Sequence, residues 1–163
     1  MSYAELKYGI GSRVSSFFTI YGESIVTTDN YLTLPIRSDD SFIIEPEFIY
    51  IDSTEEVRNR ERTSTVKGVT IGFFKLLNIG SVLRPYAGLR LGILEEKYKD
   101  KDLSSSITAT ETDSHKVVTS SLGIEYELFE DFTFASEVGV SYVKSDNADA
   151  IKSDSRLMIR MVF

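Results

Sequence analysis

The chain has 163 residues, of which 42% are hydrophobic and 26% are charged, and its formal net charge is −7. This composition is typical of one folded domain, and the acidic balance argues against a nucleic-acid partner, which would require a basic surface. Cysteine does not occur, which excludes disulfides and thiolate metal sites. No apolar run reaches the length of about 18 residues that a transmembrane helix needs, although strands of alternating hydrophobicity remain compatible with a membrane.

Hydrophobic and polar residues alternate in eight segments, and each predicts a β-strand with one apolar and one polar face. In the first segment, for example, Leu6 and Tyr8 share one face while Lys7 and Gly9 share the other. The predicted strands span about residues 4–20, 32–36, 42–50, 68–73, 83–93, 118–128, 132–142 and 154–163. An even number of antiparallel strands is typical of a closed up-and-down barrel.

The predicted connections alternate between long and short. Short turns are expected at residues 38–41, 78–81 and 129–131, and long polar loops at 21–30, 53–64, 95–114 and 145–153. Short turns on one side and long loops on the other are the pattern of outer-membrane barrels. Pro35, Pro46 and Pro85 cannot donate to a strand ladder, so we expect bulges near the short-turn rim.

The last strand carries an apolar face beside a face with Arg156 and Arg160. Left unpaired, such a strand would be an edge prone to aggregation, whereas pairing with the first strand would remove the edge. We therefore predict a closed barrel. The apolar face of this strand consists of Leu157, Ile159, Met161 and Phe163.

Glycine indicates which face of the barrel points inward. Eight of the ten glycines lie on the polar side of their strands, and the other two, Gly22 and Gly80, lie in connections. An eight-stranded barrel has an interior only wide enough for side chains, so small residues belong inside. The apolar face would then point outward, with aromatic residues near both ends of the strands, as at the two membrane interfaces. The expected fold class is all-β, a closed eight-stranded antiparallel up-and-down transmembrane β-barrel forming a single domain over residues 1–163.

These features resemble the small outer-membrane barrel family of the OmpA/OmpX type, here as a barrel domain alone. The resemblance implies an integral protein of the bacterial outer membrane, with outer-membrane lipids, lipopolysaccharide and the barrel assembly machinery as partners. It also implies that Leu157, Ile159, Met161 and Phe163 act as the C-terminal assembly signal. The N-terminus shows no signal peptide, so the sequence is expected to be the mature form. We expect a monomer without cofactor or metal.

Alternate residues of each strand share one face, which we call their parity. The polar parity, which is predicted to face inward, places charges of both signs in the lumen. Six basic and five acidic residues nearly cancel, which favours a closed network of salt bridges over an open pore or a pair of catalytic carboxylates. The predicted network consists of Lys7, Arg13, Glu45, Glu47, Arg84, Arg90, Glu125, Glu127, Glu137, Arg156 and Arg160. Within it, we expect Arg84 beside Glu125 or Glu127, and Glu137 near Arg160.

The expected function is non-enzymatic: the barrel contributes to envelope integrity or to surface interaction through its loops. One alternative is a lipid-modifying enzyme of the lipid A deacylase type, based on His115 with Asp113 and Ser120 or Ser121 nearby. His115 has the inward parity, however, whereas such enzymes carry their histidine on the lipid-facing side. A second alternative is a soluble lipid-binding barrel, which would remain monodisperse without detergent.

Overall fold

The structure is a computed structural model that describes residues 6–19, 24–25, 31–38, 41–57, 60–77, 82–105, 107–129, 131–145 and 149–163, with the backbone alone at 13–19, 24–25 and 57. Within these ranges, no helix is long and apolar enough to cross a membrane. The strands are β1 (Leu6–Thr19), β2 (Ser24–Ile25), β3 (Tyr31–Thr33), β4 (Ile36–Ser38), β5 (Phe42–Val57), β6 (Arg60–Leu76), β7 (Leu83–Asp102), β8 (Thr108–Phe129), β9 (Phe132–Ser145) and β10 (Asp149–Val162).

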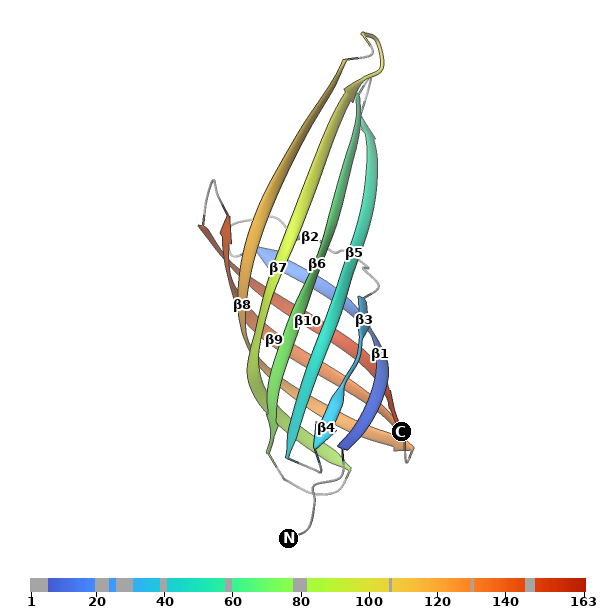
Figure 1. Ribbon diagram of the computed structural model, residues 1–163, viewed down its shortest axis with the longest axis vertical. Coiled ribbons are helices and arrows are strands. Elements are labelled where there is room, and N and C mark those ends of the chain that lie inside the picture. Colours follow the sequence, from blue (N-terminus) through green and yellow to red (C-terminus); the bar gives the residue numbers. More distant parts are fainter. Residues whose placement is uncertain are drawn as a thin grey trace.

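The strands form a closed antiparallel ring (Figure 1). Consecutive strands are neighbours from β5 to β10, and β10 pairs with β1 over eleven residue pairs, from Gly9↔Val162 to Thr19↔Lys152. Because β3 and β4 together occupy one place between β1 and β5, and β2 pairs only with β1, the ring has eight positions. The predicted closed eight-stranded barrel is therefore confirmed.

The gap between β3 and β4 coincides with two prolines, which lack a backbone N–H. The register on either side of the gap is the same, since Thr33 pairs with Glu47 and Ile36 with Ile44, which places Leu34 and Pro35 opposite Pro46 and Glu45. The donor missing at Pro35 is on the side of β1, where Pro35 O accepts from Gly9 N, and the donor missing at Pro46 is on the side of Leu34, whose N donates to Pro46 O. The one register shift among the described pairings, between Glu127 and Phe129, does lie near the short-turn rim, but no proline causes it: Pro46 and Pro85 lie within continuous ladders.

Residues 53–64 and 95–114, predicted as loops, are instead mostly strand. β5 and β6 pair as far as Val57↔Arg60, and β7 and β8 pair as far as Lys101↔Thr108, so the charged segments continue the barrel strands as two long hairpins. In Figure 1, β5 to β8 rise together far beyond β1, β9 and β10 as a curved four-stranded sheet. We refer to residues 50–57, 60–67, 95–102 and 108–114 as the extension. The predicted loop at 21–30 lies largely outside the described residues.

The barrel is apolar outside and charged inside. Large hydrophobic side chains such as Leu89, Leu122 and Val138 are about half exposed, at 51%, 63% and 58%, whereas inward side chains are buried. The half of the lumen toward the short turns also holds an apolar cluster with two aromatic rings, Phe74 and Tyr86. Glycine makes room for these rings, because a Cβ at Gly123 would collide with the ring of Tyr86 and one at Gly72 with Phe74.

Candidate functional site

The lumen holds a balanced set of buried charges among the described residues. Alternation along the strands directs every second side chain inward. Five guanidinium groups and five carboxylates are buried, namely Arg37, Arg84, Arg90, Arg156 and Arg160, and Glu45, Glu47, Glu125, Glu137 and Asp154. The equal numbers allow each buried charge to have a partner of opposite sign.

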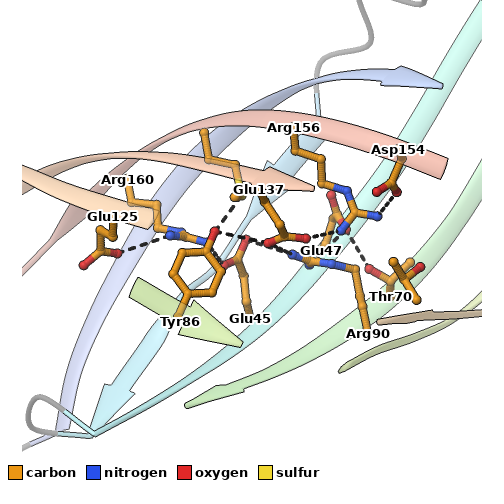
Figure 2. A network of polar contacts seen from close by, with 12 residues as sticks. Glu45, Glu47, Thr70, Tyr86, Arg90, Glu125, Glu137, Asp154, Arg156 and Arg160 are labelled. Carbon is orange, nitrogen blue, oxygen red and sulfur yellow. Dashed lines mark hydrogen bonds and ion pairs between the residues drawn. The ribbon is translucent and has the colours of Figure 1, made fainter. Parts of the chain in front are cut away.

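Arg90 of β7 is the centre of the network (Figure 2). Its Nη1 lies 3.2 Å from Glu47 Oε2, and its Nη2 lies 3.8 Å from Glu45 Oε1 and 3.6 Å from Glu137 Oε2. Thr70 Oγ1 donates to the same Glu47 oxygen at 2.7 Å. One guanidinium thus joins carboxylates from β5 and β9 across the barrel.

Two further arginines extend the network in both directions. Arg156 Nη1 donates to Glu137 Oε1 at 2.5 Å, and its Nη2 donates to Asp154. Arg160 pairs with Glu45 and, at 3.2 Å, with Glu125 Oε2. Glu45 and Glu137 therefore each link Arg90 to a guanidinium of β10, and the ion pairs form one connected network across the lumen.

Aromatic groups complete the packing around these charges. The guanidinium carbon of Arg90 lies 5.0 Å from the centre of the Phe74 ring, and that of Arg160 lies 5.7 Å from the Tyr86 ring. Tyr86 donates its hydroxyl to Glu137 Oε2 at 3.2 Å. Desolvated charges that are paired on several sides hold the lumen side chains in one arrangement and fill the space that an aqueous pore would need.

Several of the predicted lumen residues lie at its edges. Arg84 pairs with Glu127, one of its two expected partners, near the short-turn end, and the Glu127 side chain is 31% exposed. Lys7 is exposed despite its inward parity, so it is not part of the buried network. The side chain of Arg13 lies outside the described residues. Glu137 is opposite Arg156 in the ladder, and Arg160 is opposite Thr133, so the direct partner of Glu137 on β10 is Arg156, while Arg160 is near enough for its charge to act on Glu137.

Two members of the network were absent from the prediction. Arg37 of β4 pairs with Glu125 from a strand of only three residues, and Asp154 precedes Arg156 on the inward face of β10 and pairs with it. Both could have been found from parity alone. Arg37 alternates with Leu34 and Ile36, and Asp154 lies two residues before Arg156 on the same face.

The exterior carries aromatic residues toward both ends of the apolar band. Tyr8, Phe42 and Phe73 are exposed near the short-turn end, at 54%, 52% and 46%. Tyr50 and Tyr142 are exposed near the other end, at 66% and 43%. Amphipathic rings at these levels suit the two interfaces of a bilayer.

Solved structures with this architecture include the attachment invasion locus protein Ail of Yersinia pestis, which is 15% identical, with 99% of each chain covered and a TM-score of 0.61. Neisserial surface protein A is 12% identical, with 97% of each chain covered and a TM-score of 0.63. The N-terminal barrel domain of Pseudomonas aeruginosa OprF is 12% identical over 96% of this chain and 97% of that domain, with a TM-score of 0.56. The fold is that of the small eight-stranded outer-membrane β-barrels. No family model matches the sequence, and no curated protein matches it.

On this barrel, the residues of the expected assembly signal lie on the outward face of the closing strand. Leu157, Ile159 and Met161 are 52%, 48% and 45% exposed, and Phe163 follows the end of β10 at 69%. Their side chains therefore face the surroundings of the barrel and take no part in the lumen network.

His115 lies on the inward face of β8 at the long-hairpin end of the lumen, where the extension begins. Its Nε2 is 3.5 Å from Glu96 Oε2 of β7, and its side chain is 16% exposed. Its ladder partner on β9 is Ser145, whereas Ser120 has the outward parity. In the part of the chain that the structure describes, no three histidine or acidic side chains are grouped to hold a metal ion.

Proposed function

We propose that this protein is an integral, non-enzymatic barrel of the bacterial outer membrane that contributes to envelope integrity or surface interaction. The observation that carries the proposal is the inside-out distribution of side chains. Arg160 and Glu125 are fully buried in the lumen, whereas Leu122 and Val138 are more than half exposed outside. An apolar exterior around the whole barrel far exceeds the patches that soluble monomers expose, so it argues against a soluble lipid-binding barrel.

Outer-membrane lipids and lipopolysaccharide are the proposed surroundings of this exterior. Lys116 and Lys144 are direct ladder neighbours on the outward face, one row above Val118 and Tyr142. Two adjacent ammonium groups repel each other unless an anion lies between them, and the phosphates of outer-leaflet lipids would supply one. We propose that these lysines mark the outer lipid headgroup level.

The extension supplies the proposed surface for contact with other molecules. Lys97, Lys99 and Lys101 share the outward face of β7, and all three are exposed. A stripe of lysines above the membrane favours anionic partners. Ail has been solved in complex with the heparin analogue sucrose octasulfate, and a sulfated glycan is accordingly the class of surface partner that we propose to test first.

We further propose that the barrel assembly machinery inserts the chain and that the inserted barrel is a monomer. The expected recognition element is the outward row Leu157, Ile159, Met161 and Phe163. Closure of β10 on β1 supports the monomer, because the barrel wall then offers no open edge to a second copy.

A lipid-modifying enzyme is the less favoured alternative. His115 would be its catalytic base, yet its ring faces the lumen side of the wall, while an acyl chain in the membrane would approach from the other side. Comparing lipid A from cells with and without the protein tests this alternative directly.

The main proposal is tested by the requirement for an amphiphile and by cell fractionation. Circular dichroism should show a β-rich, cooperatively folded chain in detergent micelles or lipid vesicles and an aggregated or unfolded chain in plain buffer. The protein expressed with a signal peptide should fractionate with the outer membrane. A well-folded monomer without detergent would contradict the membrane assignment.

A further inference from the structure

Strand β8 has a long edge that no other described strand covers. It pairs with β7 from Thr108 onward, whereas its pairing with β9 begins only at His115 and Ser145. In the part of the chain that the structure describes, residues 108–114 therefore have a strand neighbour on one side only. We refer to these residues, which lie along one margin of the extension in Figure 1, as the β8 edge.

The hydrogen-bonding direction along the β8 edge follows from the bond that closes its hairpin. Asp102 N donates to Ile107 O at 2.9 Å, so the backbone groups of Ile107 point toward β7. In an antiparallel ladder, the backbone groups of successive residues point to opposite sides. The residues whose N–H and C=O groups point away from β7 are therefore Thr108, Thr110, Thr112 and Ser114.

The composition of the β8 edge leaves it open to a further strand. Natural proteins protect exposed edges with lysine, proline, a bulge or a covering segment. The sequence Thr-Ala-Thr-Glu-Thr-Asp-Ser contains neither lysine nor proline, and its register with β7 is continuous. An extended peptide can add to such an edge through main-chain hydrogen bonds, and its alternate side chains then decide specificity.

The charges at the margins of the extension favour a basic partner over a second copy of the chain. Glu111 and Asp113 lie on the inward face of the β8 edge. The opposite margin, along β5, carries Asp52, Glu55 and Glu56. Pairing between the margins of two copies would bring carboxylates together, and like charges across a strand pair are destabilising. A segment with a basic residue at every second position would instead place opposite charges beside Glu111 and Asp113.

We propose that the β8 edge binds an extended, basic segment of another protein by strand addition. Main-chain hydrogen bonds join the segment to Thr110 and Thr112, and its alternate basic side chains lie beside Glu111 and Asp113. The site is distinct from the lysine stripe, which lies on the outward face of β7 and favours anionic partners. The extension thus presents a basic face and an acidic edge to different classes of molecule.

The test uses the full chain in nanodiscs of zwitterionic lipid, with a peptide of alternating threonine and lysine that matches the β8 edge in length. Amide hydrogen exchange should slow about tenfold or more at Thr110 and Thr112, whose N–H groups face the added strand. The amides of Ala109 and Glu111 are internal controls, because they point toward β7. N-methylation of the peptide keeps its charges but removes its main-chain donors, and the methylated form should protect neither threonine.

A proline variant tests the main-chain hydrogen bonds. Thr112→Pro removes an N–H that faces away from β7 and leaves the ladder with β7 intact, so it should weaken binding of the unmethylated peptide about tenfold. Thr112→Val keeps the N–H and nearly the same side-chain shape, and it should bind the peptide as the unmodified protein does.

A charge variant separates the edge from general attraction to an acidic protein. Glu111→Gln should raise the dissociation constant roughly threefold, the effect of losing one exposed charge pair. Glu61→Gln is the matched control, because it removes the same charge from the outward face of β6, away from the β8 edge. Full affinity of Thr112→Pro, equal effects of the two glutamine variants, saturable binding of the methylated peptide, or protection along β5 in place of β8 would overturn the proposal.

Discussion

The backbones of Tyr8 and Phe163 exchange two hydrogen bonds, with Tyr8 N donating to Phe163 O at 3.0 Å and Phe163 N donating to Tyr8 O at 2.8 Å. This reciprocal pair lies at the short-turn end of the seam between β1 and β10. Both side chains face outward, at 54% and 69% exposure. The backbones of the two residues therefore close the barrel, and their side chains place two aromatic rings on its outward face.

Tyr8→Pro should destabilise the barrel more than Tyr8→Ala does. Both variants lose the aromatic ring, but only proline removes the N–H that donates to Phe163. We expect a difference of about 1–3 kcal/mol in the free energy of unfolding. Urea unfolding in lipid vesicles measures it, and equal stability of the two variants would show that the seam does not depend on this bond.

Phe163→Ala should have unequal effects in vitro and in cells. In purified refolding, it removes one outward-facing, exposed ring, and the loss should be about 1–2 kcal/mol. If the residue is also read by the assembly machinery, the amount of protein assembled in the outer membrane should fall much further than this loss of stability explains. Met161→Ala, on the same outward face, is the comparison. Matching defects in the two assays would indicate an anchor only.

Arg160→Met should be much more destabilising than Arg84→Met. Arg160 is fully buried between Glu45 and Glu125, so its loss leaves two carboxylates without this partner and should cost about 3–5 kcal/mol. Arg84 pairs with Glu127, which water reaches, so its loss should cost about 1 kcal/mol. Denaturant midpoints in micelles distinguish the two, and losses of equal size would contradict a desolvated lumen.

Gly123→Ala should destabilise the barrel through Tyr86, because the added Cβ would collide with the ring. Overpacking of this kind costs about 1–3 kcal/mol. In a Tyr86→Leu background, the same substitution should cost clearly less, and the double-mutant cycle reports the coupling. Leu122→Ala, on the outward face beside Gly123, should show no such coupling with Tyr86.

The tip of the β7–β8 hairpin should depend on the ionised form of Asp102. The hydroxyl of Ser104 donates to Asp102 Oδ1 at 2.6 Å and its N–H donates at 2.8 Å, which lowers the pKa of the carboxyl to about 2. A lowered pKa stabilises the turn above the ordinary value of about 4, and this contribution is lost as the pH falls through about 2.

Carboxyl-carbon NMR titration of Asp102 measures this pKa. Ser104→Ala removes the hydroxyl donor and should move the midpoint upward. Ser105→Ala should have a smaller effect, since Ser105 N donates to the same oxygen at 3.3 Å and this N–H remains. An Asp102 midpoint near 4 in the unmodified protein would contradict the turn geometry.

The sequence by itself determined the number of barrel strands, their closure and the face that each turns outward. These properties follow from parity, because neighbouring residues of a strand point to opposite faces. The glycines supported the assignment, since Gly72 and Gly123 provide the space that the inward rings of Phe74 and Tyr86 occupy. Parity also located most of the buried charges, including Glu45, Glu137 and Arg156.

Only the tertiary structure decided which charges meet. Parity leaves the relative shift of two strands open by any even number of residues, so Glu137 could face either Arg156 or Arg160, and the ladder places it opposite Arg156. The lengths of β5 to β8 were equally hidden. A polar segment such as 95–114 has the composition of a loop, and it becomes strand because cross-strand hydrogen bonds continue from the barrel to Lys101 and Thr108.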